Sequence, residues 1–269
     1  MQNYKMPERA QESNKGSFGK ILNFSGSKNY IGAAFLSTYS ALKVGAGFVA
    51  LASENKITDS VSKLLPEAVY LETKEGINNI NKYTVCLIGC GLGQSKKAKD
   101  LLKKVIKEVK FPLVIDADGL NILANTKLSL NENTIITPHP REASRLLSIS
   151  VNEILSDTEA AAKKLSQKYN CIAVLKTHRT VICEGENIFI NQHGNSALAK
   201  AGSGDVLAGI VAGLLAQGMK PFEAAKLGVY LHSRSGELAS EDLTEYSVLA
   251  SDIPKYLPSA IKELVNQSI

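Results

Sequence analysis

Short apolar runs alternate along the chain with longer segments in which apolar residues recur at intervals of three and four. The first pattern predicts buried strands and the second predicts amphipathic helices. The predicted strands are Lys20–Ser25, Phe48–Ala52, Thr84–Ile88, Leu113–Ile115, Thr134–Thr137, Cys171–Leu175 and a hairpin of Thr180–Cys183 with Asn187–Ile190. The predicted helices are Gly32–Val44, a lysine-rich segment between 96 and 110, Asn152–Tyr169, Asp205–Ala216, Pro221–Ser240 and, roughly, Ser251–Val265.

Most of the predicted strands are apolar on both faces and alternate with helices. This order is typical of a mostly parallel central sheet covered by helices on both faces, so we predict an α/β fold. No linker rich in proline, glycine or serine and no internal repeat interrupts the chain, and we predict one domain over residues 1–269. In such folds ligands bind beyond the carboxyl ends of the strands, which makes the residues that follow each strand the candidates for function.

Composition and charge narrow the classes of protein to consider. The 269 residues are 44% hydrophobic and 21% charged, as in an ordinary globular protein, and the formal net charge is +5. Much of this charge lies between 96 and 110, where lysines are interspersed with Leu102, Val105 and Ile106 at helical spacing. We interpret the segment as an amphipathic helix with a solvated lysine face. The alternative, a nucleic-acid patch, lacks interleaved aromatic residues, so we expect no nucleic-acid partner.

The sequence lacks two kinds of pattern, those of membrane or signal segments and those of disulfide or zinc-binding cysteines. No apolar stretch approaches the roughly 18 residues of a membrane span, and residues 1–16 contain no apolar signal core, so we expect no membrane partner and a cytoplasmic protein. The four cysteines, Cys86, Cys90, Cys171 and Cys183, form no CxxC pair and no cluster with zinc spacing. We predict no oxidising compartment and no zinc cluster of cysteines and histidines, and we assign no residue as a metal ligand.

The strongest candidate for chemistry is Gly202-Ser203-Gly204-Asp205, which precedes a clear apolar helix. Amide groups at a helix start are unsatisfied, and the helix dipole favours an anion there. Glycines allow a phosphate to approach the backbone closely. Asp205 would lie beside that phosphate and could accept the proton of an attacking hydroxyl. The simpler alternative is that Ser203 or Asp205 only caps the helix.

Glycines and carboxylates follow two other predicted strands. Gly89-Cys90-Gly91-Leu92-Gly93 hints at a dinucleotide fingerprint, but its third glycine comes one position early, and a tight strand-to-helix turn is the alternative. Asp116 and Asp118 lie at a strand end, where a carboxylate could meet magnesium. More often such residues cap the following turn, and we favour the cap for Asp118.

Two basic side chains also follow predicted strands. His139 stands between Pro138 and Pro140 in a rigid backbone, and a lone histidine of this kind is usually structural. Lys176 could be a solvated lysine or could meet a phosphate as a point charge. His193 and His232 have no evident partner in the sequence.

A series of short motifs follows the chain in a fixed order. The motifs are Lys15–Gly19, Tyr30–Ala34, Ala41–Gly47, Ile88–Gly93, Ile115–Asn121, Thr137–Glu142, Val174–Thr180 and Gly194–Gly209. In their order and spacing, from about Lys15 to Ala239, they resemble the NAD(P)H-hydrate dehydratases, one branch of the ribokinase-like superfamily. The resemblance implies a ribokinase-like α/β fold.

The same resemblance implies a reaction and its participants. The expected substrates are NADHX and NADPHX, the hydrates of the reduced nicotinamide cofactors, with ADP or ATP as co-substrate and Mg²⁺ as cofactor. ADP is expected as the donor, with AMP and phosphate as products. A homo-oligomer, and specifically a tetramer, is expected, together with a separate epimerase that acts in the same pathway.

The resemblance also assigns the candidate residues. Asp205 is expected to be the catalytic base and to contact the substrate. The expected substrate-binding residues are Ala33, Gly91, Gly93, His139, Asn195 and Asp205, and the expected nucleotide-binding residues are Lys176, Thr177, His178, Arg179, Thr180, Gly202, Ser203 and Gly204.

The sequence departs from the usual family pattern at a few positions, and two rival functions stay open. Cys90 and Ser196 stand where proline is common, Ala201 replaces a frequent glycine, and 177–179 are larger than usual. One rival is a small-molecule kinase of the same fold that acts on a vitamin precursor. The other is a nucleotide-binding regulator without activity, against which an intact Asp205 argues.

Overall fold

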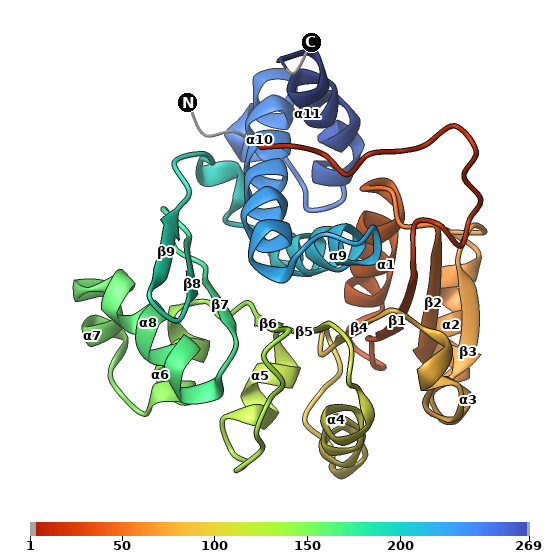
Figure 1. Ribbon diagram of the computed structural model, residues 1–269, viewed down its shortest axis with the longest axis horizontal. Coiled ribbons are helices and arrows are strands. Elements are labelled where there is room, and N and C mark those ends of the chain that lie inside the picture. Colours follow the sequence, from red (N-terminus) through yellow and green to blue (C-terminus); the bar gives the residue numbers. More distant parts are fainter. Residues whose placement is uncertain (1–3, 268–269) are drawn as a thin grey trace.

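The computed structural model describes residues 4–267, which build a nine-stranded sheet with the strand order β3-β2-β1-β4-β5-β6-β7-β8-β9 (Figure 1). The strands are β1 (Lys20–Phe24), β2 (Phe48–Ser53), β3 (Val69–Glu72), β4 (Val85–Ile88), β5 (Leu113–Ile115), β6 (Thr134–Ile136), β7 (Ile172–Leu175), β8 (Val181–Glu184) and β9 (Asn187–Ile190). Strands β1 to β7 pair in parallel, whereas β8 and β9 are antiparallel. The predicted mostly parallel sheet and the predicted terminal hairpin are therefore confirmed.

Helices cover both faces of the sheet, as the apolar strands require. One face carries α1 (Ile31–Lys43), α9 (Ser203–Ala216), α10 (Pro221–Ser247) and α11 (Ile253–Gln267). The other face carries α3 (Thr73–Asn78), α4 (Lys96–Glu108), α5 (Asp118–Leu123), α6 (Pro140–Leu147), α7 (Val151–Ser156) and α8 (Thr158–Tyr169). Helix α2 (Asn55–Ser62) packs near the β2–β3 edge, against α1 and β2.

Alternate residues of each central strand point into different layers of the core. In β1, Ile21 packs on the α1–α9 side and Leu22 packs on the α4 side, and both side chains are fully buried. The same alternation holds for Leu87 and Ile88 of β4. The two apolar faces explain why these strands read as continuous apolar runs rather than as alternating ones.

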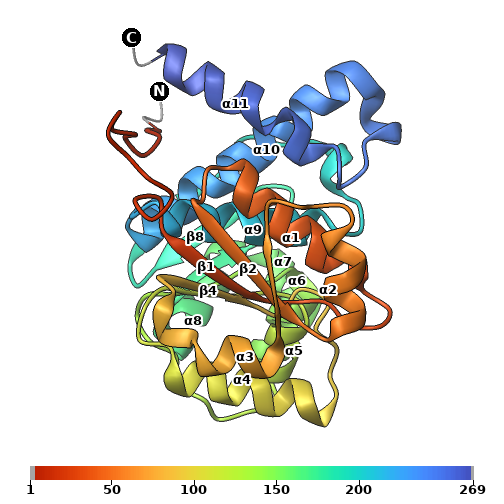
Figure 2. The same cartoon turned by 90° about the vertical axis from the view of Figure 1, so that its right-hand side faces the viewer.

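The position of α9 depends on a close approach to α1 (Figure 2). A Cβ atom at Gly209 would lie 2.2 Å from the carbonyl oxygen of Ser37, and one at Gly213 would lie 2.2 Å from Cγ1 of Val44. Only glycine permits this separation of the two helix axes, so these two positions fix where the start of α9 lies above the sheet.

Some predicted elements were wrong in their extent. The helix expected over Asn152–Tyr169 is two helices, because Asp157 has non-helical backbone angles and its carboxylate accepts a hydrogen bond from the amide of Ala160 at 2.9 Å. The last part of α10 extends to Ser247 past a distortion at Thr244, where φ is 67°. Strand β3 and helices α2, α3, α5 and α6 were not predicted, because they are short and only partly apolar.

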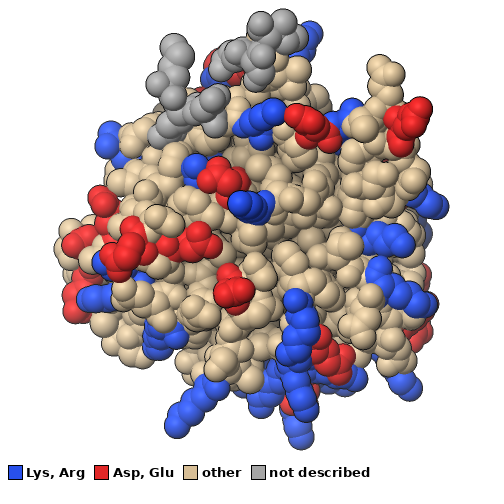
Figure 3. All heavy atoms as spheres, in the orientation of Figure 1, with Lys and Arg blue, Asp and Glu red and all other residues tan. Residues whose placement is uncertain are grey.

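The lysine-rich segment is the amphipathic helix α4, with Ala98, Leu102, Val105 and Ile106 buried. Its lysines lie at the surface, and blue side chains gather over this part of the molecule in Figure 3. The four cysteines are buried and free. Within the described part of the chain, no helix combines the length and the apolar character that a membrane crossing needs.

Candidate active site

A cavity of about 980 Å³ opens beyond the carboxyl ends of β5, β6 and β7, beside the start of α9. We call it the α9 cavity. The candidate residues that line it are His139, Lys176, Thr177, His178, Arg179, Thr180, Asn195, Gly202, Ser203, Gly204 and Asp205. The folded chain therefore brings together both groups expected from the sequence, the predicted nucleotide-binding residues and three of the predicted substrate-binding residues.

The start of α9 presents backbone amides to this cavity. Gly202 precedes the helix with φ at +94°, a backbone conformation that favours glycine, and no side chain caps the helix. Asp205 is the acidic residue in its first turn. The amide of Ser203 donates to the carbonyl oxygen of Lys200 at 3.2 Å, so in this turn the amides of Gly204 and Asp205, together with the helix dipole, are available to an anion.

Asp205 lies in a tight cluster with Cys90 and Asp116. One oxygen of each carboxylate and the sulfur of Cys90 all lie within 4.8 Å of one another. Burial and the nearby Asp116 carboxylate raise the pKa of Asp205 to about 6, while the Cys90 thiol and the Lys176 ammonium act in the opposite direction. A carboxylate with this pKa is ionised at neutral pH and still basic enough to accept a proton.

Lys176 is held by carboxylates rather than by solvent. Its Nζ atom donates to Oδ1 of Asp116 at 2.8 Å, and the Asp116 side chain is 1% exposed. Burial by itself would lower the pKa of Lys176, but the carboxylates of Asp116 and Glu142 outweigh it and raise the pKa. The lysine therefore stays positively charged at the wall of the cavity, next to Gly204, whose Cβ position lies 3.1 Å from Nζ.

His139 is fixed as an uncharged ring. It precedes α6, and its Nδ1 atom accepts from the amides of Arg141 at 3.1 Å and Glu142 at 3.4 Å. This arrangement places the ring proton on Nε2. Burial, followed by the charge of Lys176, lowers the pKa of His139 to about 4. The ring is therefore both a helix cap and part of the cavity wall at neutral pH.

The wall of the α9 cavity also contains His232, for which no partner is evident in the sequence. His232 of α10 is buried, and its Nε2 atom lies 3.0 Å from both Oγ and the carbonyl oxygen of Ser203. Burial lowers the pKa of His232 to about 4. The neutral ring supports the first residue of α9. No sequence signal points to it, because 29 residues separate the two partners.

Asn195 and the loop after β7 complete the α9 cavity. The Asn195 side chain accepts from the amide of Ala197 at 3.1 Å and donates to Ser240 at 2.7 Å, so its orientation is fixed. Thr177 donates to the carbonyl oxygen of Arg179 at 2.6 Å, which closes the loop between β7 and β8. This loop places a histidine and an arginine, both exposed, at the mouth of the cavity.

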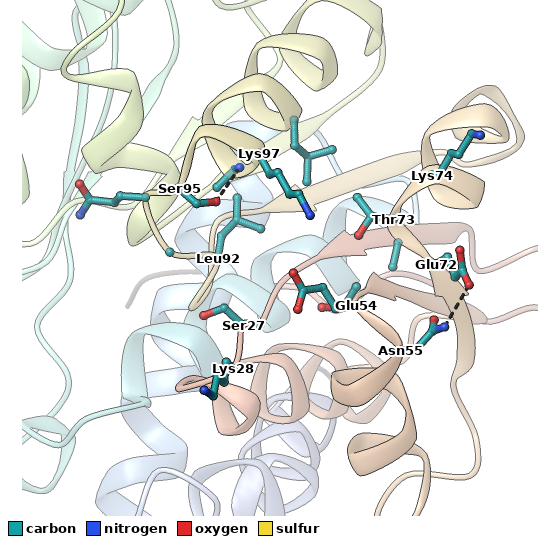
Figure 4. Close-up of a pocket in the computed structure, with 17 residues that line it drawn as sticks. Ser27, Lys28, Glu54, Asn55, Glu72, Thr73, Lys74, Leu92, Ser95 and Lys97 are labelled. Carbon is teal, nitrogen blue, oxygen red and sulfur yellow. Dashed lines mark hydrogen bonds between the residues drawn. The ribbon is translucent and has the colours of Figure 1, made fainter.

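The other three predicted substrate-binding residues lie outside this cavity. Ala33 and Gly91 are buried and lie against each other, since a Cβ at Gly91 would be 2.8 Å from Cβ of Ala33. Gly93 lines a second cavity of about 570 Å³, shown in Figure 4, beyond the carboxyl ends of β1 to β4. We call this second space the β1–β4 cavity.

Asp118 corrects one expectation from the sequence. No side chain caps α5, so the helix-capping role favoured for Asp118 is wrong. Its carboxylate accepts instead from the amide of Gly93 at 2.8 Å, and Oδ1 lies 3.5 Å from Nε2 of Gln94. Asp118 therefore braces the loop between β4 and α4 at the boundary of the two cavities. Asp118 thus contacts a residue that is distant in the sequence instead of capping its own turn, and the spacing of residues in the sequence could not indicate this contact.

The chain has clear relatives among known proteins. A family model described as NAD(P)H-hydrate dehydratase matches residues 21–259. An ADP-dependent (S)-NAD(P)H-hydrate dehydratase of Neisseria meningitidis is 37% identical over 241 residues, which cover 87% of this chain and 81% of the relative. Bifunctional NAD(P)H-hydrate repair enzymes also match, and the chain spans about half the length of these relatives.

Solved structures agree with this result. A ribokinase-like superfamily protein of Enterococcus faecalis superposes with a TM-score of 0.89 at 33% identity, covering 96% of this chain and 92% of the other. An ADP/ATP-dependent NAD(P)H-hydrate dehydratase of Bacillus subtilis, co-crystallised with ATP and Mg²⁺, superposes with a TM-score of 0.87 at 30% identity, covering 96% and 94%. The predicted ribokinase-like fold is confirmed.

Proposed function

Because this chain belongs to the NAD(P)H-hydrate dehydratase family, we propose that it uses ADP to restore NADH and NADPH from their hydrates, NADHX and NADPHX. The arrangement at the start of α9 is the observation that carries the proposal. There an uncapped helix start, a fixed ammonium group and a carboxylate of pKa about 6 line one cavity. Together they suit the transfer of a phosphoryl group to a hydroxyl.

The first step is the transfer itself. Asp205 accepts the proton of the hydroxyl that hydration has left on the nicotinamide ring. The hydroxyl oxygen then forms a bond to the terminal phosphorus of ADP, and AMP leaves with the electron pair of the broken P–O bond. The amides of the first turn of α9 and the charge of Lys176 stabilise the negative charge that develops on the phosphoryl oxygens.

The second step removes the phosphorylated group. The ring carbon loses phosphate, which takes the C–O electron pair, while the lone pair of the ring nitrogen forms a double bond to that carbon. Loss of a proton from the neighbouring carbon restores the reduced nicotinamide ring. Phosphate is a far better leaving group than hydroxide, and this explains why a dehydration would consume a nucleotide.

The residues around Asp205 suit a Mg²⁺ ion that binds together with the phosphates of the nucleotide, rather than an ion held by the protein alone. Mg²⁺ prefers oxygen ligands and keeps several waters, and it commonly binds through one or two carboxylates together with substrate phosphates. Asp116 and Asp205 supply carboxylate oxygens beside the start of α9, whereas the thiol of Cys90 is a poor ligand for this ion. We expect Asp116 to contribute to holding the ion, which would neutralise phosphate charge.

The donor is proposed to be ADP. Lys176 and the residues up to Thr180 would hold the adenosine monophosphate portion, so that the terminal phosphate reaches Gly204 and Asp205. A donor with one more phosphate would have to shift outward by one phosphate to present its terminal group. The residues at 177–179 are larger than those usual in the family and line the cavity, and we propose that they decide the choice of donor.

Purified NADHX provides the test. The protein is incubated with Mg²⁺ and either ADP or ATP at equal concentration, and the recovery of NADH absorbance is followed together with the release of AMP and phosphate. We expect NADH, AMP and phosphate in equal amounts with ADP. A clear preference for ATP would refute the choice of donor and leave the reaction intact. A stable phosphorylated product without NADH would indicate a kinase, and no nucleotide turnover would indicate a regulator.

A further inference from the structure

The β1–β4 cavity lies at the point where the strand order of the sheet reverses. From β1 the chain continues to β2 and β3 on one side, and then returns to β4 on the other side of β1. The loops that follow β1 and β4 diverge at such a point and leave a crevice beyond the strand ends. Ser27 and Lys28 follow β1, and Gly93 and Ser95 follow β4, and all four line the cavity.

Most charged side chains of this cavity are divided between two sides, and Lys74, beside Glu72 and Thr73, is a further lysine that lines it (Figure 4). Lys97, in the first turn of α4, extends into the space, and Lys28 stands on the rim next to Ser27. Glu54 and Glu72 lie across from them, directly after β2 and β3. Glu72 accepts from the side chain of Asn55 at 3.0 Å. In the range 4–267, neither Lys97 nor Lys28 has a carboxylate within the 4.0 Å of an ion pair.

This pattern suits a nucleotide better than a simple anion. Ammonium and hydroxyl groups on one side bind a phosphate, and carboxylates on the other side accept hydrogen bonds from ribose hydroxyls or from an amino group of a base. An acidic residue after a strand, opposite a glycine-rich turn, is the arrangement with which α/β proteins bind a ribose. Here Glu54 supplies the carboxylate and Gly91 to Gly93 supply the turn.

The two cavities are neighbours across a single bracing contact. Asp118, which holds the amide of Gly93 at 2.8 Å, directly follows Ala117 on the wall of the α9 cavity. The same carboxylate contributes to raising the pKa of Asp205, so it lies in the electrostatic neighbourhood of the catalytic group. A Cβ at Gly93 would come no closer than 3.8 Å to any neighbour, which is the side chain of Ser27. The space directly beside the Cα atom of this glycine is therefore open.

We propose that the β1–β4 cavity binds the adenosine-phosphate half of the dinucleotide substrate, and that Lys97 and Lys28 hold its phosphate. The nicotinamide half would then lie over Gly93 with its hydroxyl at Asp205, while ADP occupies the α9 cavity. This inference rests on the proposed function for the identity of the ligand. The phosphate in contact with the lysines belongs either to the diphosphate bridge, which both substrates carry, or to the ribose, where only NADPHX carries one.

The test uses three variants of the protein. Lys97→Ala and the double variant Lys28→Ala/Lys97→Ala remove one or both of the lysines proposed to hold the phosphate, and Lys74 stays in place. Lys103→Ala is the matched control, because Lys103 is exposed on the same helix α4 and does not line the cavity. NADPH and NADH are titrated by calorimetry in the presence of saturating ADP. This measurement needs no dehydration, and KM and kcat with NADPHX and NADHX are measured separately.

We expect the double variant to raise the Kd of NADPH and the KM of NADPHX about tenfold, with kcat and ADP binding nearly unchanged. An equal loss for NADH and NADPH assigns the lysines to the diphosphate, and a loss confined to NADPH assigns them to the ribose phosphate. Wild-type affinity in the double variant, an equal loss in Lys103→Ala, or no binding of either dinucleotide by the wild type would overturn the inference. If the dinucleotides bind and this binding depends on the lysines, but NADHX and NADPHX are not turned over, the proposed dehydratase activity is refuted and the proposed binding site is supported.

Discussion

The chemistry of individual residues in the α9 cavity follows from burial. Asp205, Asp116 and Glu142 are three carboxylates in one small region, and Lys176 is the buried cation that they share. One cation does not offset three buried negative charges, so protons bind more tightly there than in water. The pKa of Asp205 is raised to about 6 and that of Glu142 to about 7, in each case chiefly by burial.

The first prediction concerns the pH dependence of turnover. Asp205 acts as a base only when it is ionised, so kcat/KM should fall about tenfold for each pH unit below a pKa of about 6 and should level off above it. In Cys90→Ala the acid limb should move to higher pH, because the thiol helps to lower this pKa. A profile without an acid limb between pH 5 and 7, measured by initial rates, would contradict the role of Asp205.

The second prediction concerns Asp205→Asn. Turnover should fall on the order of 10²–10⁴-fold, because the amide cannot accept the proton.

The same variant should also be more stable than the wild type at high pH. The pKa of Asp205 in the folded state lies above its ordinary value of 3.8, so its protonation stabilises the native state fully below about pH 4. This stability is lost as the pH rises through about 6. The variant should therefore exceed the wild type in unfolding free energy by on the order of 2 kcal/mol at pH 8.

Denaturant unfolding at pH 4 and pH 8 measures this difference, which should shrink at the lower pH. Asp59→Asn is the matched control, because Asp59 is exposed on α2, and its unfolding free energy should follow that of the wild type at both pH values. If Asp205→Asn were less stable than the wild type at pH 8, the hydrogen bonds that the carboxylate accepts would stabilise the native state by more than the burial of its charge destabilises it.

At the scale of elements, the approach of α9 to α1 positions the amides that we propose to bind phosphate. The helix is almost entirely buried, and Gly209 and Gly213 face α1, so adding one methyl group at either position would alter the separation of the two helices. The start of α9 is in addition supported by His232 from α10. The site therefore depends on α9 and α10, which are consecutive in the sequence, and on α1, which is far from both.

The third prediction compares two glycines in these helices. Gly209→Ala should destabilise the protein by about 1–3 kcal/mol, because its Cβ would lie 2.2 Å from a backbone carbonyl oxygen that cannot move freely. Gly32→Ala, at an open position of α1 with nothing within 4 Å, should be neutral or stabilising by up to about 1 kcal/mol. Thermal unfolding distinguishes the two, and equal stability of the variants would show that the helices can separate without cost.

At the scale of the whole molecule, both cavities share one edge of the sheet. The α9 cavity uses the ends of β5 to β7, and the β1–β4 cavity uses the ends of the other four parallel strands. A parallel sheet places all its carboxyl ends along one edge, so a long substrate and a nucleotide are able to bind there side by side. The tetramer expected from the family resemblance stays a prediction, which light scattering of the purified protein would test.

The fourth prediction concerns the stability of the whole chain with nucleotide. ADP that binds only the folded state should stabilise it by about 2.7 kcal/mol at 100 times its Kd, or roughly 5–10 °C in Tm. Gly204→Val should lose most of this shift, because the new side chain would crowd Nζ of Lys176 and the path to the amides of α9. A full shift in this variant, measured by differential scanning fluorimetry, would place the nucleotide elsewhere.

Several features were determined by the sequence alone. The apolar runs predicted eight of the nine strands and the mostly parallel sheet, because burial on both faces leaves a continuous apolar signal. The motif at 202–205 predicted a helix start, since glycine and a following helix are local features. Strand β3 and the short helices gave too weak a periodic signal over too few residues to be recognised.

Only the tertiary structure determined which residues that are distant in the sequence contact one another. Lys176 pairs with Asp116 across 60 positions, Ser203 meets His232 across 29, and Asp118 holds Gly93 instead of capping its own helix. The tertiary structure also places three of the predicted substrate-binding residues in the α9 cavity and Gly93 in the β1–β4 cavity. Local sequence sets the backbone pattern of each segment, but charge and hydrogen-bond partners depend on which strand ends the sheet topology places side by side.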